Sequence, residues 1–339
     1  MESLTAVVLA AGQGTRMKSQ WPKVLHKVCG VPMAEQVIRT VKKAGSEKCV
    51  VVTGFKEELV RERLAGENIY FVHQEEQLGT AHAVMQAVPL FKDNRDGYVL
   101  VVCGDTPLLC RETIEGLVCA CRDHDGAAAV LTAIMDNPFG YGRVLRDAKG
   151  HMISIVEQKD GTPDQLAVHE INTGTYVFKT GALLDSLEKV DNKNAQGEYY
   201  LTDVFEILIK AGRKVIPVAA EDASETMGVN SRIQLAEADR ILRIRKAEDL
   251  MAAGVTITDP YSTYIEQDVE VGQDTVILPG TMLQGKTKVG KNCTLGPDTQ
   301  LTDVICGDGN HLNRVYAHSC ELGDNNEIGP FVHLRPETC

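Results

Sequence analysis

The sequence predicts an α/β fold: a domain with a mixed, mainly parallel sheet, then a long connector helix, then a left-handed parallel β-helix. Strand-like and helical runs alternate through the first half of the chain. One amphipathic stretch follows, and aliphatic residues then recur every six positions almost to the end. The expected domains are residues 1–228 for the α/β part, 229–254 for the connector and 255–339 for the β-helix.

The alternating runs of the first half define a Rossmann-like sheet. Their strand-like members are apolar throughout, which is typical of parallel strands covered by helices on both faces. Beyond Gly126 the strand-like runs lengthen, so we expect part of the sheet to be antiparallel. The expected strands are LTAVVLAAG, CVVVTG, IYFVHQ, YVLVVCGD, AAAVLTAIM, YGRVLR, MISIVEQ, TGTYVFK and KVIPVAA, and the expected helices cover 32–44, 56–64, 79–91, 181–190 and 202–211.

The connector helix has a signal at each end. Ser231 is of a residue type that caps helix N-termini, and Gly254 is of the type that ends helices. The Leu and Ile residues between them suit one packed face.

A six-residue period defines the last part of the chain. An aliphatic residue at every sixth position, often followed by glycine, indicates hexapeptide repeats in which that residue points into the coil. A β-rich domain with chance spacing is the weaker alternative. The chain ends at Cys339 within a repeat, so we expect a truncated coil. The periodic residues are Val271, Ile277, Leu283, Val289, Leu295 and Leu301, and, after an irregular stretch, Leu322, Ile328 and Leu334.

Composition argues against several classes of protein. The formal net charge is −12, whereas nucleic-acid and anionic-membrane surfaces need an excess of Lys and Arg. No apolar run approaches the length of a transmembrane helix, and Glu2 precedes the first apolar run, where a signal peptide has basic residues. The 10 cysteines form no C-x-x-C pair, which favours reduced thiols. We therefore expect a cytoplasmic protein that binds neither nucleic acid nor membrane.

The glycine-rich turn after the first strand narrowly fails two phosphate-binding patterns. Gly12, Lys18 and Ser19 fit the P-loop, and Gly12 and Gly14 fit the dinucleotide fingerprint. In both patterns Met17 stands where a further glycine belongs, and its side chain would block close approach of the backbone to a phosphate. The turn is therefore of another type.

Several separated motifs resemble those of one enzyme family, in the same order. LAAGQGTRM followed by PKVLHKVCG resembles the signature of sugar-1-phosphate nucleotidylyltransferases, and EINTGTYVF, AQGEYYLTD and MGVNSR narrow the match. With the hexapeptide tail, the whole chain resembles the bacterial bifunctional N-acetylglucosamine-1-phosphate uridylyltransferase / glucosamine-1-phosphate acetyltransferase family.

The glycine turn is the expected nucleotide site. It follows the carboxyl end of a strand, where open α/β sheets bind ligands, and its N–H groups can hold a nucleotide. The resemblance implies that the two cations Arg16 and Lys23 neutralise the phosphates during catalysis. Alone, the motif is equally a plain strand-to-helix turn with solvated basic residues. The residues that the resemblance assigns to the nucleotide here are Leu9, Ala10, Ala11 and Gly12.

A second group of residues is expected around the base. A glutamine amide offers both a donor and an acceptor, as the edge of uracil requires. The resemblance implies that Gln74, Gly79 and Thr80 bind the uridine and that Cys103 and Gly104 contact the nucleotide. The family often has Tyr where this chain has Cys103, so only a backbone role carries over there. The alternatives are a surface position for Gln74 and a helix N-cap for Gly79 and Thr80, and Thr80 can serve both as a cap and as a ligand.

Asp105 directly follows an apolar strand. A carboxylate there can hold Mg²⁺, a hard cation that takes oxygen ligands and bridges phosphates; an Asp that caps a turn is the ordinary alternative. The resemblance implies that Asn230 is the second metal ligand, with a position beside the helix N-cap as the alternative. We expect Mg²⁺ as the cofactor.

The resemblance also implies a sugar site. It assigns Gly142, Glu157 and Asn172 to N-acetylglucosamine, and carboxylate and amide groups suit sugar hydroxyls and an acetamido group. Alone, Glu157 is a solvated charge at a strand end and Asn172 a turn residue. Arg335 matches a family residue on the acetyl-acceptor side.

The implied reaction is uridylyl transfer. The phosphate of N-acetylglucosamine 1-phosphate attacks the α-phosphorus of UTP, pyrophosphate leaves, and the cell-wall precursor UDP-N-acetylglucosamine forms. The resemblance further implies a homotrimer. We expect no acetyl transfer, because the family's residues for it lie further along the coil than Cys339. The alternatives are a nucleotidylyltransferase for another sugar 1-phosphate and a non-catalytic scaffold that binds a nucleotide sugar.

Overall fold

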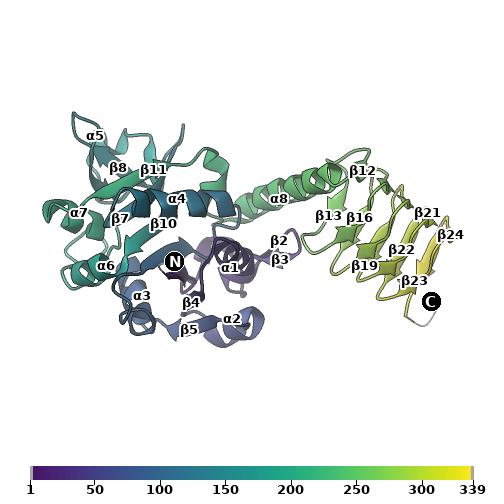
Figure 1. Ribbon diagram of the computed structural model, residues 1–339, viewed down its shortest axis with the longest axis horizontal. Helices are drawn as coiled ribbons and strands as arrows, with labels where there is room; N and C mark the ends of the chain where they lie inside the picture. The colour runs from purple at the N-terminus through teal and green to yellow at the C-terminus, as the bar shows by residue number, and fades with distance from the viewer. Residues whose placement is uncertain (1–2, 337–339) are drawn as a thin grey trace. The chain divides into compact units, whose positions relative to one another are not determined.

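The computed structural model describes residues 3–336. Contacts divide the chain into two compact units, residues 1–26 with 32–234 and residues 27–31 with 235–339 (Figure 1). The domain limits expected at 228 and 254 stay predictions. Within residues 3–336, no helix is long and apolar enough to cross a membrane.

The first unit contains a nine-stranded mixed sheet, in the order β11-β7-β10-β6-β1-β4-β5 with β8 beside β10 and β9 beside β8. β1 runs parallel to β4 and β6, whereas β10 runs antiparallel to β6 and β7. The predicted change to antiparallel pairing is thus confirmed. The strands are β1 (Leu4–Leu9), β4 (Lys48–Thr53), β5 (Ile69–His73), β6 (Tyr98–Cys103), β7 (Ala128–Ile134), β8 (Gly142–Arg146), β9 (Met152–Val156), β10 (Glu170–Lys179) and β11 (Val215–Ala219).

Helices cover both faces of this sheet, which explains its apolar strands. In β1, Val7 packs into one hydrophobic core, and its neighbours Ala6 and Val8 pack into the other. All three side chains are completely buried. The helices of the first unit are α1 (Met33–Lys43), α2 (Glu57–Leu64), α3 (Thr80–Ala87), α4 (Arg111–Asp123), α5 (Pro163–Leu166), α6 (Thr180–Leu187) and α7 (Asp203–Lys210).

The ends of α8 (Arg232–Ala252) agree with the predicted signals. The Ser231 hydroxyl accepts a hydrogen bond from the Gln234 N–H at 3.2 Å, as a capping side chain does. Gly254 has a φ of +95°, a backbone conformation that glycine adopts readily and that commonly follows a helix end.

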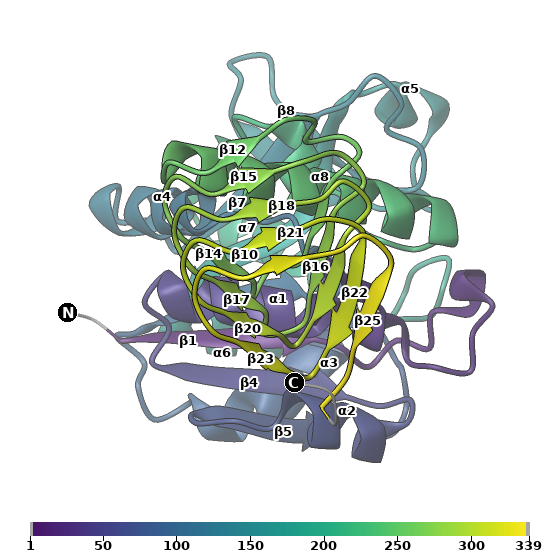
Figure 2. The same cartoon turned by 90° about the vertical axis from the view of Figure 1, so that its right-hand side faces the viewer.

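The second unit contains the predicted left-handed parallel β-helix. Short strands stack into three parallel sheets, ordered β12-β15-β18-β21-β24, β13-β16-β19-β22-β25 and β14-β17-β20-β23 (Figure 2). The strands are β12 (Thr256–Ile257), β13 (Tyr264–Ile265), β14 (Glu270–Val271), β15 (Val276–Ile277), β16 (Met282–Gln284), β17 (Lys288–Val289), β18 (Thr294–Leu295), β19 (Gln300–Thr302), β20 (Ile305–Cys306), β21 (His311–Leu312), β22 (Val315–His318), β23 (Glu321–Leu322), β24 (Glu327–Ile328) and β25 (Val332–Leu334). The hairpin partners β2 (Lys27–Val28) and β3 (Val31–Pro32) were not predicted.

The stretch that seemed irregular in sequence continues the same coil. Cys306 pairs in register with Val289, Leu312 with Leu295, and Ala317 with Leu301. The steps from Leu301 to Cys306, from Leu312 to Ala317 and from Ala317 to Leu322 are five residues rather than six. Shorter corners therefore interrupt the period without interrupting the stack. The expected end of the coil at Cys339 lies outside the described residues.

The interior column of the β-helix gives the first testable prediction. Leu295 is completely buried, so Leu295→Ala should lower the free energy of unfolding by about 2–5 kcal/mol through the cavity it leaves. Ile305 lies in the same coil with 49% of its surface exposed, and Ile305→Ala should change that free energy by less than about 0.5 kcal/mol. Urea unfolding followed by circular dichroism compares the two. Equal losses would mean that Leu295 does not face the core.

Candidate active site

The glycine turn after β1 shows why Met17 stands where a phosphate loop has glycine. Met17 is 1% exposed, so its side chain points into the core rather than toward a ligand. Gly14 has a φ of +67°, and a Cβ there would lie 2.4 Å from Lys23 Cβ, so glycine is needed for Lys23 to pack against the turn. A Cβ on Gly12 would meet no atom within 4 Å. The open approach is therefore over Gly12.

A hollow of about 350 Å³ lies at this turn and at the carboxyl ends of β1 and β6. Its walls include most residues predicted for the nucleotide, together with Asp105 and four residues that were not predicted. The predicted residues that line it are Leu9, Ala10, Ala11, Gly12, Lys23, Gln74, Gly79, Thr80, Cys103 and Asp105, and the others are Val24, Gln77, Ala83 and Glu198.

Lys23 joins the two predicted metal ligands. Its Nζ forms an ion pair with Asp105 Oδ2 and donates a hydrogen bond to Asn230 Oδ1 at 2.9 Å. The side chains of Lys23 and Asp105 are only 14% and 15% exposed, so water screens the pair weakly. The sequence separates Asn230 from Lys23 by more than two hundred residues, and the fold brings them together.

The backbone around Asn230 fixes the direction of its amide. The Val229 N–H donates to the Asp105 carbonyl at 2.8 Å, which ties this segment to the end of β6. Asn230 Nδ2 points toward the Gly228 carbonyl at 3.4 Å. Asn230 Oδ1 is consequently the atom that faces the cluster.

The donor set of this cluster fits a hard divalent cation. The oxygens of Asp105 and Asn230 already converge on one positive group, the Lys23 ammonium. A carboxylate and an amide oxygen are ligands that Mg²⁺ accepts. Within residues 3–336 no group of three or more His, Cys, Asp or Glu side chains is placed to hold a metal, so the protein offers few ligands here, as is usual for Mg²⁺ bound with phosphates.

Arg16 and Gly104 are placed differently from the other nucleotide residues. Arg16 is exposed in the turn and lies outside the walls of the hollow. The Gly104 N–H donates to the Leu9 carbonyl at 2.9 Å, which joins the ends of β1 and β6. Any ligand contact of Gly104 would therefore use atoms other than its N–H.

Cys103 is a neutral thiol. Burial raises its pKa to about 12, with the nearby Asp105 carboxylate adding to the shift. Its Sγ lies 3.8 Å from the Gly174 carbonyl. The side chain therefore does not act as a nucleophile at neutral pH.

The residues predicted to bind the base are fixed by contacts with the rest of the protein. Gln74 is 3% exposed, which excludes the surface alternative. Thr80 Oγ1 accepts a hydrogen bond from the Leu201 N–H at 3.0 Å. The N-cap of α3 is Gly79, so the alternative of a helix N-cap holds at Gly79, whereas Thr80 is the first residue of the helix and its side chain does not cap it. A Cβ on Gly79 would lie 2.5 Å from the Tyr199 carbonyl, so this turn requires glycine.

The three predicted sugar residues also lie together. Gly142 on β8 pairs with Asn172 on β10. A Cβ on Gly142 would lie 3.4 Å from Glu157 Oε2, just beyond the end of β9. Burial raises the pKa of the Glu157 carboxyl, and the hydrogen bond from Thr202 partly opposes this. Asn172 is 8% exposed and donates through Nδ2 to Tyr176 Oη at 2.8 Å.

Besides Glu198, sequence reasoning missed three polar residues of the site. Gln77 donates through Nε2 to the Ala11 carbonyl at 2.8 Å, and Thr202 donates to Glu157 Oε1 at 3.1 Å. His82 lies against the Gln74 amide. Thr202 belongs to the GEYYLTD stretch, which was a signal in the sequence, whereas Gln77 and His82 have no distinguishing pattern.

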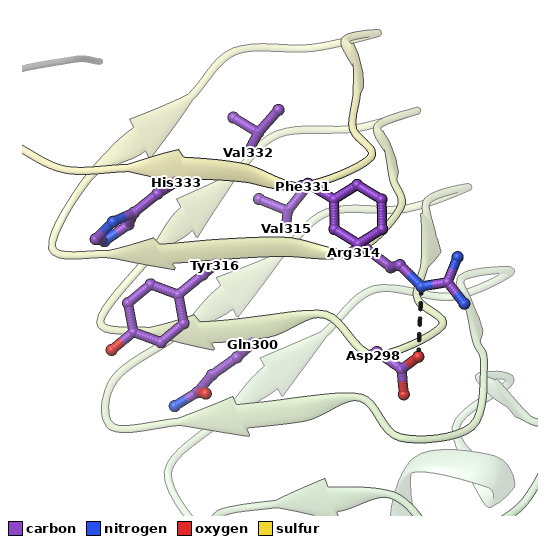
Figure 3. A pocket seen from close by; sticks show the side chains of 8 residues that line it. All are labelled: Asp298, Gln300, Arg314, Val315, Tyr316, Phe331, Val332 and His333. Atoms are coloured by element: carbon purple, nitrogen blue, oxygen red, sulfur yellow. Dashed lines mark ion pairs between the residues drawn. The ribbon is translucent and has the colours of Figure 1, made fainter.

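The second unit has a hollow of its own, about 520 Å³, on the face formed by β22 and β25 (Figure 3). The ring centroids of Tyr316 and His333 are 4.8 Å apart, and the Arg314 guanidinium lies 5.8 Å from the Phe331 ring. Arg335, predicted for the acetyl-acceptor side, lies outside its walls, with Nε 3.4 Å from His333 Nδ1. The lining residues are Asp298, Gln300, Arg314, Val315, Tyr316, Phe331, Val332 and His333.

The fold and the first hollow define a nucleotidyltransferase, and residues 6–170 match the family model of the MobA-like NTP transferase domain. Comparison with curated proteins is more specific. The chain is 50% identical over 333 residues to the bifunctional protein GlmU of Geobacillus sp. strain WCH70, covering 98% of this chain and 72% of that protein. The GlmU of Caldanaerobacter subterraneus subsp. tengcongensis is 46% identical over 341 residues, 100% of this chain and 73% of that protein. The chain therefore belongs to the bifunctional GlmU family, and it makes UDP-N-acetylglucosamine by uridylyl transfer.

Proposed function

We propose that Lys23, Asp105 and Asn230 form the catalytic centre for transfer of a uridylyl group from UTP to N-acetylglucosamine 1-phosphate. The observation that supports this most directly is the convergence of one ammonium and two oxygen ligands beside the open glycine turn. The hollow that Lys23 and Asp105 line also contains Gln74 and Thr80, proposed to bind the uridine.

The chemistry requires charge neutralisation rather than a general base. The attacking phosphate oxygen is already anionic, so catalysis reduces to positioning and stabilisation of negative charge. Lys23 Nζ has three hydrogens, and with two directed at Asp105 and Asn230 it keeps one for a phosphate oxygen. Arg16, exposed in the same turn, supplies a mobile second cation. When bound, Mg²⁺ would neutralise phosphate charge, and Asp105 and Asn230 would hold it.

The sugar phosphate is proposed to bind beside Gly142, Glu157 and Asn172. Glu157 is a partly buried carboxylate held by Thr202, so it is preorganised to accept hydrogen bonds from sugar hydroxyls. Gly142 provides space next to it, because a Cβ there would lie 3.4 Å from Glu157 Oε2.

Pyrophosphate release is the test of this function. The chain should release pyrophosphate fastest with UTP and N-acetylglucosamine 1-phosphate, and more slowly with dTTP, GTP or other sugar 1-phosphates. Faster turnover of another nucleotide and sugar 1-phosphate would show that the substrates proposed here are wrong. Binding without release for every pair would favour the scaffold alternative.

Glu157→Gln should raise the stability of the protein and weaken its binding of the sugar phosphate. Because burial raises the pKa of Glu157, the folded state binds its proton more tightly than the unfolded state, and stability falls as pH rises from about 4 through the raised value. The neutral glutamine removes this loss. The variant should therefore have a higher Tm than the wild type at pH 7, and the difference should vanish below about pH 4.

The same variant should bind the sugar phosphate less well. Loss of a charge-assisted hydrogen bond should raise KM for N-acetylglucosamine 1-phosphate roughly ten- to a hundredfold, with KM for UTP little changed. Glu188→Gln on the exposed surface is the control. A lower Tm at pH 7 would contradict the raised pKa of Glu157, and an unchanged KM for the sugar phosphate would show that Glu157 is not a sugar ligand.

We also propose that the chain assembles as a homotrimer through its β-helix, as the family resemblance implies. Exposed aromatic residues on that unit, Tyr316 and Phe331, support an interface there. Light scattering at micromolar concentration should give three times the mass of the 37.0 kDa chain. A monomer alone at that concentration would refute the assembly. The cytoplasmic location and the lack of acetyl transfer stay predictions.

A further inference from the structure

The amide of Gln74 is held in one orientation. Its Nε2 donates to the Gly79 carbonyl at 3.1 Å and lies 3.1 Å from Nδ1 of His82. The backbone N–H of Gln74 donates to the Thr53 carbonyl at 2.8 Å, which fixes the residue at the end of β5. Because Gly79 offers only a carbonyl oxygen here, the atom facing it must be the amide nitrogen.

The imidazole of His82 is positioned to take the second hydrogen of that amide. A neutral imidazole has a single acceptor nitrogen, and two amides compete for it, since Gln86 Nε2 lies 3.2 Å from His82 Nε2. Gln86 is partly exposed and already donates to the His82 carbonyl at 3.0 Å, so water can serve its other hydrogen. Gln74 is 3% exposed and needs a protein acceptor. The lone pair therefore belongs on Nδ1.

With both hydrogens engaged, the amide oxygen is the atom of Gln74 left for a ligand. Among the described residues, no hydrogen bond ends on Gln74 Oε1, and Gln74 lines the hollow at the glycine turn. The site thus presents an acceptor to a ligand. Rotation of the amide by half a turn would point its oxygen toward the Gly79 carbonyl and the His82 lone pair, which are both acceptors. Rotation is costly because the rotated amide loses two hydrogen bonds and its oxygen is repelled by both acceptors.

We propose that His82 is a positioning residue that selects uracil against cytosine by holding Gln74 as an acceptor. Uracil N3 carries a hydrogen and donates to Oε1. Cytosine N3 is an acceptor at the same place, so two lone pairs would meet. This inference rests on the proposed function, in which Gln74 reads the base.

The ring of Tyr199 limits where the His82 imidazole can move. The two rings are tilted relative to each other, and their centroids are 6.4 Å apart. Tyr199 also belongs to the segment that closes on Gly79, because its N–H donates to the Leu78 carbonyl at 2.7 Å and its carbonyl accepts from Ala81 at 2.9 Å. The turn that reads the base and the residue that orients it therefore both contact the segment around Tyr199.

The test compares kcat/KM for UTP and CTP in pyrophosphate release with N-acetylglucosamine 1-phosphate. His82→Ala removes one of the two acceptors, so the UTP-to-CTP ratio should fall roughly five- to tenfold, as expected for loss of one neutral hydrogen bond. The change should appear in KM rather than kcat, since the reacting phosphates are untouched. His82→Asn places a carbonyl oxygen near the position of Nδ1 and should restore most of the ratio.

Gln86→Ala is the matched control, because Gln86 contacts the other ring nitrogen and should leave the ratio unchanged. Melting curves show whether each variant folds. A folded His82→Ala that keeps the wild-type ratio would overturn the role of His82 while leaving uridylyl transfer intact. A wild-type chain that does not use UTP would instead refute the proposed function itself.

Discussion

Lys23→Ala should lower kcat for pyrophosphate release by about 10²–10³, with a smaller effect on KM. The expected size follows from the position of the ammonium, which is 14% exposed and directed by Asp105 and Asn230 toward the open side of the glycine turn. Such a preorganised charge acts most strongly where negative charge develops in the transition state. Steady-state rates at saturating UTP and sugar phosphate measure the effect.

Lys27→Ala is the matched control for this prediction. Lys27 is exposed and lies outside the hollow, so its loss should leave kcat within a factor of about two. If Lys23→Ala instead raises KM for UTP and keeps kcat, Lys23 contributes uniform binding and is not a catalytic residue.

Asp105→Asn should lower activity at least about tenfold at low Mg²⁺, and added Mg²⁺ should partly restore it. The substitution keeps the size of the side chain and removes the charge that a hard cation binds most strongly. It also breaks the ion pair with Lys23, so the comparison needs a measurement of folding. Melting curves of the variant provide it.

Asn230→Ala should show the same rescue more weakly, because a neutral amide oxygen contributes less to a hard cation than a carboxylate does. The Val229–Asp105 backbone bond is independent of the Asn230 side chain, so the segment should keep its place. Near-normal activity of Asp105→Asn at low Mg²⁺ would mean that Asp105 only shapes a turn.

The sequence predicts the fold well where the burial of an element imposes a regular pattern of apolar residues. In β1, alternate residues face two cores, and an apolar run is the direct result. The interior column of the β-helix follows its six-residue period for the same reason. The five-residue steps near Cys306 and Ala317 escaped prediction, because the spacing changes there and the inward residues are a cysteine and an alanine rather than Val, Ile or Leu.

The site was predictable only in part. Motifs pointed to Lys23, Asp105 and Asn230, but the hydrogen bonds that join them depend on tertiary packing across distant segments. The engagement of the Gly104 N–H by Leu9 and the contact between His82 and Gln74 are likewise tertiary. Residue types alone do not indicate which of their polar atoms are already satisfied.

A titration of Mg²⁺ in the pyrophosphate-release assay, run in parallel on the wild type, Lys23→Ala and Asp105→Asn, tests the proposed centre most directly. We expect Asp105→Asn to require more Mg²⁺ for its half-maximal rate and to recover in part. Lys23→Ala should stay slow at every Mg²⁺ concentration, because it lacks the ammonium that contacts the phosphates and Mg²⁺ does not replace that group. Recovery of Lys23→Ala by Mg²⁺, or an unchanged Mg²⁺ requirement of Asp105→Asn, would contradict the division of roles between the cation and its two oxygen partners.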